Sequence, residues 1–245
     1  MHDDGDGVAT TPLGTEPDME RVFETAVERA LLLLNGRDGR KGRSILGIAG
    51  PPAAGKSTLA RHVVAEVVRR EGADAAAYLP LDGFHLSNPQ LDRLGLRACK
   101  GAPETFDAWG YLALLNRVAT ERFRDVFVPD FDRDLDEPVA ARHVVRPHTR
   151  LVVTEGNYLA VPAEPWQAAR RLMSELWFVD AEETVRTERL LRRHQRGGGP
   201  REAAELRIAA NDHPNAEYVK QGRAGCDWVV RTGSLPPDRD GRSVL

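Results

Sequence analysis

The sequence predicts an α/β domain built on a parallel β-sheet with helices on both faces. Short apolar runs that suit buried strands alternate along the chain with longer amphipathic runs that suit helices. Crossovers between parallel strands of one sheet are right-handed, and they place helices over the sheet. A glycine-rich loop, Gly50–Ser57, joins the first apolar run to an amphipathic run. The 245 residues suffice for one large domain, and no internal repeat is visible.

The first third of the chain carries two helix patterns around one strand pattern. Residues 1–17 are rich in Gly, Asp, Thr and Pro without periodicity, so we expect a disordered tail before a single domain at 18–234. Apolar residues from Met19 to Leu34 recur on one helical face, and Gly36 follows as a stop. Ser44–Ala49 is the first predicted strand, and the helix after the glycine-rich loop closes at Gly72.

In the middle of the chain the predicted strands and helices are shorter and less regular. Ala75–Leu81 is a second buried strand, which we expect to finish early because Pro80 cannot donate to a ladder. Asp107 is the expected N-cap of a helix that continues through Val118. Val126–Val128 is typical of a short strand, whereas residues 129–138 are too irregular for a regular element.

The last third adds further strands and helices. Leu151–Thr154 and Leu176–Val179 are buried strand patterns, and Asp180 with Glu183 forms a predicted capping box for an arginine-rich helix. Gly197–Pro200 ends that helix. The remaining predicted segments are helices at 201–210 and 215–220, a strand at 228–231 and a polar tail at 235–245.

Composition narrows the classes of function. The formal net charge of −3 gives no basic field, so we expect neither nucleic acid nor an anionic membrane as a partner. Cys99 and Cys226 lie far apart and outside any C-x-x-C spacing, which argues against a disulfide scaffold or a zinc site. The first residues lack the regions of a signal peptide, and no apolar stretch is long enough to span a bilayer. We therefore expect a cytoplasmic protein with a small ligand.

The glycine-rich loop fits a phosphate-binding pattern. Its residues Gly50-Pro51-Pro52-Ala53-Ala54-Gly55-Lys56-Ser57 match G-x-x-x-x-G-K-[ST], with the strand and helix that the motif needs on either side. We therefore predict a P-loop NTPase fold in which backbone N–H groups up to Thr58 bind phosphate oxygens. Lys56 is expected to reach the β- and γ-phosphates, and the Ser57 hydroxyl to bind Mg²⁺. The alternative is a glycine-rich turn with a surface lysine.

Two acids stand at the ends of predicted strands. Asp82 follows the strand that ends near Leu81, and Glu155 follows Thr154. Ligands of parallel α/β sheets lie outside the carboxyl ends of the strands, so both acids and the glycine-rich loop should share one rim. One acid can take the proton of an attacking hydroxyl while the other holds Mg²⁺ or its waters. Each acid could instead only cap the helix or turn that follows it.

The arginine-rich helix admits two interpretations. Its arginines recur at three- and four-residue steps, at Arg189, Arg192, Arg193 and Arg196. With the glycines that follow as a hinge, the segment from about 189 to 214 would be a small helical lid that closes over the transferring phosphate. The alternative is a solvated helix face whose arginines pair with neighbouring glutamates.

Six segments together resemble one family. They are GPPAAGKST at 50–58, LPLDGFHLSN at 79–88, KGAPETFD at 100–107, PDFDRDLDEP at 129–138, VVTEGNY at 152–158 and ERLLRRH at 188–194. In combination they resemble the group of phosphoribulokinases, uridine kinases and bacterial pantothenate kinases, nearest to its nucleoside or sugar kinase-like members. The resemblance covers residues 44–230 and implies ATP, Mg²⁺ and an acceptor hydroxyl on a small metabolite.

The resemblance also implies roles for individual residues. Asp82 matches the catalytic carboxylate of the family, Glu155 matches the acid at the end of a later strand, and Arg192 and Arg193 fall in the lid. The KGAPETFD string is nearest to pantothenate kinases, so its polar residues are expected to shape the acceptor side. These residues are Lys100, Glu104 and Asp107. Members of the family are commonly dimers, so the resemblance allows a homodimer.

The acceptor itself stays open. Its pocket is expected to combine rings and charges that suit a pantoic acid, a nucleoside or a sugar, although each side chain could equally be a packed ring or a solvated charge. The candidates are Phe84, His85, Lys100, Phe131, Asp132, Arg133, Arg142 and Tyr158.

Three functions compete. The favoured one is an ATP-dependent phosphotransferase that moves the γ-phosphate to a small-molecule hydroxyl, with Asp82 as base. A nucleotide-binding regulator is second, because residues 92–95 match D-x-x-G, although no N-K-x-D follows to read guanine. The third is an accessory protein that has lost catalysis, against which Asp82 and Glu155 argue.

Overall fold

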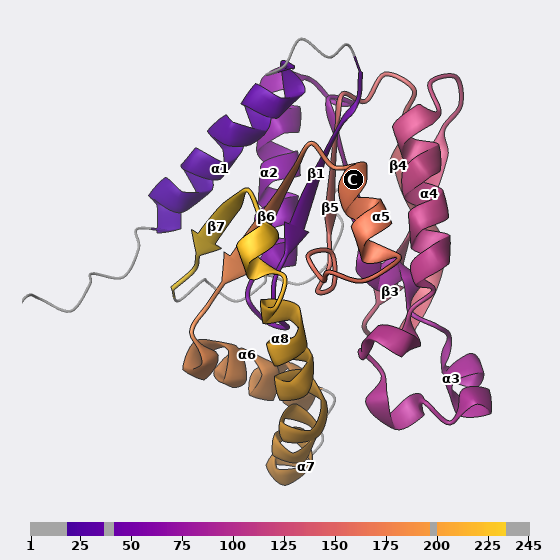
Figure 1. Cartoon of the computed structure of the whole chain (residues 1–245), viewed down its shortest axis with the longest axis vertical. Helices are drawn as coiled ribbons and strands as arrows, with labels where there is room; N and C mark the ends of the chain where they lie inside the picture. The colour runs from indigo at the N-terminus through magenta and orange to yellow at the C-terminus, as the bar shows by residue number, and fades with distance from the viewer. Residues whose placement is uncertain (1–18, 37–41, 197–199, 234–245) are drawn as a thin grey trace, which may run out of the picture.

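A computed structural model describes residues 19–36, 42–196 and 200–233 (Figure 1). The predicted tails at 1–17 and 235–245 and the predicted hinge glycines 197–199 lie outside these residues. The helices are α1 (Met19–Leu34), α2 (Lys56–Glu71), α3 (Asn88–Leu94), α4 (Ala108–Thr120), α5 (Trp166–Arg171), α6 (Glu183–Gln195), α7 (Arg201–Arg207) and α8 (His213–Lys220). The strands are β1 (Ser44–Ala49), β2 (Ala76–Pro80), β3 (Val126–Asp132), β4 (Glu137–Val145), β5 (Leu151–Glu155), β6 (Glu175–Asp180) and β7 (Trp228–Arg231).

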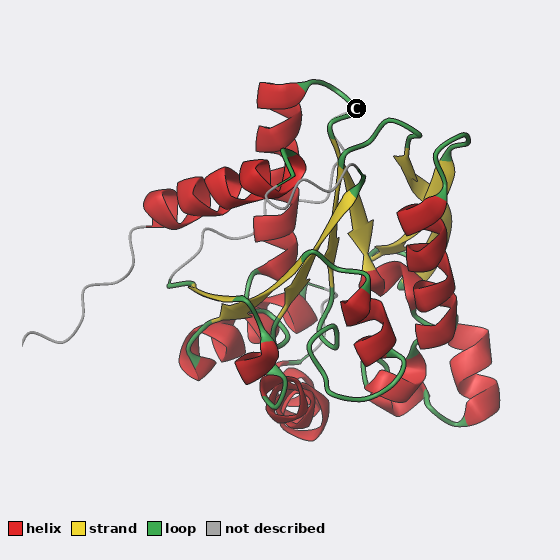
Figure 2. Cartoon of the chain, turned by 45° about the horizontal axis from the view of Figure 1, so that its top comes forward, coloured by secondary structure: helices red, strands yellow, loops and turns green. Residues whose placement is uncertain are grey.

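A five-stranded parallel sheet forms the centre of the molecule. Its strand order is β2-β5-β1-β6-β7, and every neighbouring pair is parallel. Helices α1 and α2 lie on one face, and α4 and α5 lie on the other (Figures 1 and 2). Helices α6, α7 and α8 gather beyond one end of the sheet (Figure 1). The predicted α/β architecture with helices on both faces is therefore confirmed.

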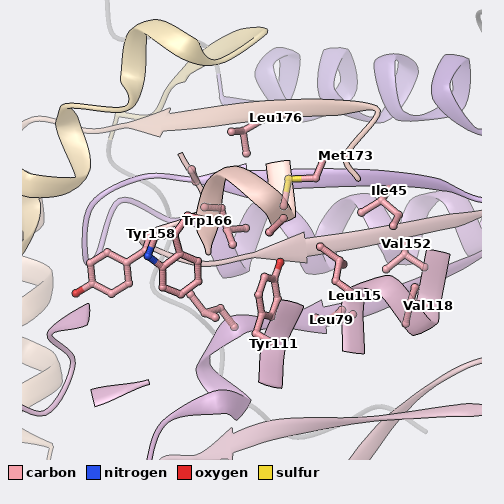
Figure 3. Packing of buried hydrophobic residues seen from close by; sticks show 14 of the residues in the cluster. Ile45, Leu79, Tyr111, Leu115, Val118, Val152, Tyr158, Trp166, Met173 and Leu176 are labelled. Atoms are coloured by element: carbon pink, nitrogen blue, oxygen red, sulfur yellow. The ribbon is translucent and has the colours of Figure 1, made fainter. Parts of the chain in front are cut away.

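The central strand β1 is buried on both faces, as its apolar run predicts. Successive side chains of a strand point to opposite faces. Accordingly, Ile45 and Ala49 belong to the core under α4 and α5, whereas Leu46 and Ile48 belong to the core under α1 and α2. Figure 3 shows Ile45 in the first of these cores, together with side chains of α4 and α5. Two separate cores thus hold the sheet rigidly from both sides.

A β-hairpin replaces the irregular segment that we expected at residues 129–138. Strands β3 and β4 pair antiparallel from Val126↔Val145 to Asp132↔Glu137. Pro129 is tolerated because the register shifts between Val128 and Asp130, where the ladder is irregular. The prediction was wrong because this irregularity interrupts the alternation of polar and apolar residues that marks a strand.

Three further expectations need correction at the level of elements. Helices α3 and α5 were not predicted, because seven and six residues are too few to show a helical period. The capping box of α6 is wrong: Glu182 is the N-cap without a side-chain bond, and Asp180 accepts from Arg223 instead (3.1 Å). The predicted break between 210 and 215 is absent, because a π-helical turn, Ile208–Asp212, connects α7 to α8.

Several local predictions are confirmed. Strand β2 ends at Pro80, and Gly72 is the C-cap of α2. The Asp107 side chain caps α4 by accepting a hydrogen bond from the Gly110 N–H (2.8 Å). In the described part of the chain no helix is both long enough and apolar enough to cross a membrane.

Candidate active site

The strand order brings the two acids and the glycine-rich loop to one rim. Strand β5 lies between β1 and β2, and Glu155 at its end is level with Ile48 of β1 and Pro80 of β2. Gly50 follows β1 directly, and Asp82 lies two residues beyond β2. The prediction of a shared rim is confirmed, with Glu155 in the middle.

The backbone of the loop requires its glycines. Gly50 has φ of 145° and Gly55 has φ of 103°, values that side chains rarely allow. A Cβ on Gly50 would also fall on the carbonyl oxygen of Val179. Gly55 then serves as the N-cap of α2, so the helix begins at Lys56 with its N-terminal N–H groups on the loop. The conformation is the one that an anion-binding loop needs.

Lys56 is held inside this loop with its charge only partly compensated. Its side chain is 7% exposed, and Nζ donates to the carbonyl oxygen of Pro51 (3.1 Å). Burial lowers the pKa of Lys56 to about 8, although the charges of Glu155 and Asp82 oppose the shift. No carboxylate lies within ion-pair distance of Nζ in the described residues. A bound phosphate would therefore supply the negative charge that this lysine lacks.

Glu155 collects hydroxyl groups around one carboxylate oxygen. Its Oε1 accepts from Ser57 Oγ (3.0 Å) and from the Tyr78 hydroxyl (2.7 Å), and the residue is 3% exposed. Burial, followed by repulsion from Asp82, raises the pKa of Glu155. A carboxylate and a hydroxyl are hard oxygen donors of the kind that Mg²⁺ takes together with substrate phosphates and water. No group of three or more His, Cys, Asp or Glu side chains suited to a metal occurs within the described ranges.

Asp82 faces the rim from a short 3₁₀ turn, Leu81–Phe84. The turn packs so tightly on β3 that a Cβ on Gly83 would fall on the carbonyl oxygen of Pro129. Burial would raise the pKa of Asp82, but nearby positive charges lower it further than burial raises it. They are the charge of His85 when its ring is protonated at low pH and the charges of Arg133, Arg193 and Lys56. Asp82 is therefore ionised at neutral pH and able to accept a proton.

His85 has a defined protonation state next to Asp82. Its Nδ1 lies 2.8 Å from the carbonyl oxygen of Asp82, which can only accept, so Nδ1 carries the proton. Burial lowers the pKa of His85, so the ring is neutral at neutral pH. Its Nε2 is then a hydrogen-bond acceptor. Phe106 and Phe131 flank the ring, with centroids 4.0 and 4.8 Å away.

The arginines of α6 differ in what they contact. Arg189 donates to the carbonyl oxygens of Ala53 (3.1 Å) and Gly233 (2.8 Å), so it ties the glycine-rich loop to α6. Arg192 is exposed and pairs with Glu188 one turn away (3.3 Å), as the solvated-face alternative describes. Arg193 is close enough to Asp82 and Lys56 to lower the pKa of both. Of the two predicted lid arginines, Arg193 is therefore the one directed at the rim.

The predicted acceptor residues divide into two sets. His85, Phe131 and Arg133 lie around Asp82, and the Arg133 Nη2 is 3.9 Å from Asp82 Oδ2. The others are already engaged in packing or pairing. Phe84 packs edge-on against Tyr111, Tyr158 is fully buried with its hydroxyl donating to Gly101 O, Arg142 pairs with Asp132, and Lys100 is bound by Asn88 and Asp136.

The sequence did not single out several residues of the rim. Tyr78 binds Glu155 and was counted only as part of an apolar strand, where its hydroxyl is the one polar group that could have signalled a role. Thr232 donates to Ala54 O (2.9 Å) and secures the loop from beyond β7. Arg186 on α6 is 1% exposed, and two of its nitrogens have no hydrogen-bond partner in the described part of the chain. Burial lowers the pKa of Arg186, although the nearby charges of Glu183, Glu217 and Asp180 oppose the shift.

The fold and this rim define a P-loop kinase, and comparisons with known proteins agree. No family model matches the chain. “Putative uridine kinase C227.14” of Schizosaccharomyces pombe is 31% identical over 215 residues, which are 85% of this chain and 90% of that protein. YggC of Escherichia coli is 36% identical over 189 residues, 77% of each chain. The chain therefore belongs to the P-loop kinase group that includes the phosphoribulokinases, uridine kinases and bacterial pantothenate kinases.

Solved structures support the same fold. A “putative fructose transport system kinase” from Silicibacter sp. TM1040 superimposes with a TM-score of 0.73 and 30% identity, over 85% of this chain and 98% of that one. YFH7 of Saccharomyces cerevisiae gives a TM-score of 0.72 at 18% identity, over 87% of this chain and 99% of that one. At such low identity the second likeness concerns the fold alone.

Proposed function

We propose that this kinase is an ATP-dependent phosphotransferase that moves the γ-phosphate of ATP to a hydroxyl of a small metabolite. The observation that carries the proposal is the meeting, at one rim, of a phosphate loop with a buried lysine and an ionised Asp82. The phosphate loop follows β1 and the proposed base follows β2, so the two lie at the ends of the strands on either side of β5. This separation suits a reaction in which two substrates meet in line.

Asp82 is the proposed base. It accepts the proton of the acceptor hydroxyl as the hydroxyl oxygen bonds to the γ-phosphorus. The bond from that phosphorus to the β,γ-bridging oxygen breaks, and the electron pair leaves on ADP. Lys56, with Arg193, balances the negative charge that develops on the phosphate oxygens. Arg192 is exposed and pairs with Glu188, so it could balance this charge only if α6 changed its orientation.

Ser57 and Glu155 are the proposed Mg²⁺ residues. Their oxygens lie 3.0 Å apart, so one ion could be held by the Ser57 hydroxyl directly and by Glu155 directly or through water. An ion held there would neutralise negative charge on the phosphates. The hydrogen bond from Tyr78 fixes the Glu155 carboxylate before any ion arrives.

A phosphorylation screen tests the proposal. The protein would be incubated with ATP, Mg²⁺ and a panel of nucleosides, sugars, polyols and hydroxy acids, and products read by mass spectrometry. We expect ADP release that depends on one acceptor class and on Mg²⁺. ADP release that no acceptor stimulates, at the slow rate of a regulatory NTPase, would contradict the proposal.

A further inference from the structure

The acceptor side of the rim carries three predicted cations, of which two are already neutralised. Lys100 Nζ is bound by Asn88 Oδ1 (2.6 Å) and by the carbonyl oxygen (2.6 Å) and carboxylate (3.0 Å) of Asp136, and its side chain is 5% exposed. Arg142 pairs with Asp132 across the β3–β4 hairpin. These two cations organise the protein itself, and their charges are satisfied before an acceptor binds.

Arg133 is different. It sits in the turn of the hairpin, its side chain is 47% exposed, and its nearest ionic partner in the described residues is Asp82, at 3.9 Å. That distance is too long for a hydrogen bond. The guanidinium therefore presents its donors to the space in front of the catalytic carboxylate. Arg193 and Arg207 add positive charge on the lid side, where Arg193 is repelled by both other arginines.

We propose that the acceptor carries an anionic group, a carboxylate or a phosphate, which Arg133 binds while Asp82 accepts the proton of a nearby hydroxyl. This inference rests on the function proposed above and narrows its substrate class. A planar guanidinium matches the two oxygens of such a group, and bonds of this kind are among the strongest in proteins. The proximity of Arg133 and Asp82 means that the anionic group and the reacting hydroxyl lie a few bonds apart on one molecule.

The remaining walls fit a short polar acceptor. Phe131 and Phe106 enclose the His85 ring, and His85 Nε2 is left as a hydrogen-bond acceptor for a second hydroxyl. A neutral nucleoside or sugar would leave the half-exposed Arg133 guanidinium with only the Asp82 carboxylate, at 3.9 Å, as its ionic partner, and would form no charge-assisted hydrogen bond with it. A hydroxy acid or a phosphorylated alcohol would form such a bond.

Matched acceptor pairs test this inference. Each acid of a panel of small hydroxy acids would be compared with its own carboxamide, and each phosphate monoester with its parent alcohol, by kcat/KM at saturating ATP. We expect the charged member to exceed its neutral partner by about 10- to 100-fold, the effect of one charge-assisted hydrogen bond. A preference for the acid over its carboxamide would identify the anionic group as a carboxylate, and a preference for the monoester over its alcohol would identify it as a phosphate.

Substitutions of Arg133 add a second readout. Arg133→Gln should lower kcat/KM for the charged acceptor about 10- to 100-fold, mainly through KM, and leave the neutral analogue and the KM for ATP nearly unchanged. Arg133→Lys should restore part of the loss. Arg124→Gln, an exposed arginine ahead of β3, is the matched control and should behave as the unmodified protein.

Three results would overturn the inference in different ways. If neutral alcohols are phosphorylated as well as their charged partners, the anionic group is wrong while the kinase proposal stands. If Arg133→Gln lowers kcat/KM equally for both members of a pair, Arg133 does not bind the anionic group. ADP release that no acceptor stimulates would reject the proposed function and this inference with it.

Discussion

At the scale of single residues, Lys56 shows how burial prepares a side chain for an anion. The ammonium has lost most of its water and gained only one backbone acceptor, so its proton is held more weakly than in solvent. A triphosphate would reverse this, because a nearby negative charge favours the protonated form. If Lys56 binds the nucleotide as proposed, nucleotide binding and protonation of Lys56 should be linked.

This linkage gives a pH prediction. With a pKa of about 8 in the free protein, Lys56 is charged at pH 7 and loses its proton as the pH rises. ATP affinity should therefore fall above about pH 8, by up to about tenfold per pH unit, and binding there should take up protons. Calorimetry from about pH 6.5 to about 9.5, in two buffers of different ionisation enthalpy, measures both quantities.

Two variants serve as controls for this linkage. Lys56→Arg keeps its charge throughout the range, so its ATP affinity should vary less with pH. Lys56→Ala should weaken ATP binding at every pH. A flat affinity for the unmodified protein, without proton uptake, would show that Lys56 does not contact the nucleotide.

At the scale of elements, the β3–β4 hairpin and the turn that carries Asp82 form one unit. Gly83 has no side chain because the carbonyl of Pro129 occupies that position, and the Asp130 nitrogen lies 2.8 Å from where a Cβ would stand. The hairpin that carries Arg133 is thereby fixed against the turn that carries Asp82. A shift of either element would change the geometry between base and acceptor.

Gly83→Ala tests this contact. The added methyl group overpacks the contact, which should cost about 1 to 3 kcal/mol and lower the melting temperature by several degrees. The kcat/KM for the acceptor should fall, while the Kd for ATP should change little because the phosphate loop lies on a different strand. Gly225→Ala, where a Cβ would meet nothing within 4 Å, is the control. A Gly83→Ala variant with unchanged melting temperature and acceptor kinetics would refute the coupling.

Features that depend on residues close in sequence were predicted correctly, whereas features that depend on residues distant in sequence were not. The phosphate loop, the cap at Asp107 and the end of β2 at Pro80 were predictable because each depends on a few neighbouring residues. Tyr78 and Arg186 were not, because their roles depend on Glu155 and on the packing of α6, which are distant in sequence. The hairpin was missed because it depends on a pairing that the local pattern around Pro129 conceals.

At the scale of the whole molecule, the order of the strands creates the site. Strand β5 is inserted between β1 and β2, although it follows them by a long stretch of sequence, and this places Glu155 between the phosphate loop and Asp82. The two cores on either side hold the strands in register. In the proposed reaction the nucleotide would bind on the phosphate-loop side of Glu155 and the acceptor on the Asp82 side. This division predicts that the two binding events can be separated by mutation.

The most direct measurement of that division is single-turnover phosphate transfer by Asp82→Asn, combined with calorimetry for ATP. The amide keeps the shape of Asp82 but cannot take the proton, so transfer to the acceptor found in the screen should slow by about 10² to 10⁴. The Kd for ATP should stay within about a few-fold of the original, because the proposal places Asp82 on the acceptor side and not on the phosphate loop. Transfer at the unmodified rate would contradict the role of Asp82 as base. Loss of ATP affinity together with rate would instead place Asp82 at the metal and leave Glu155 as the base.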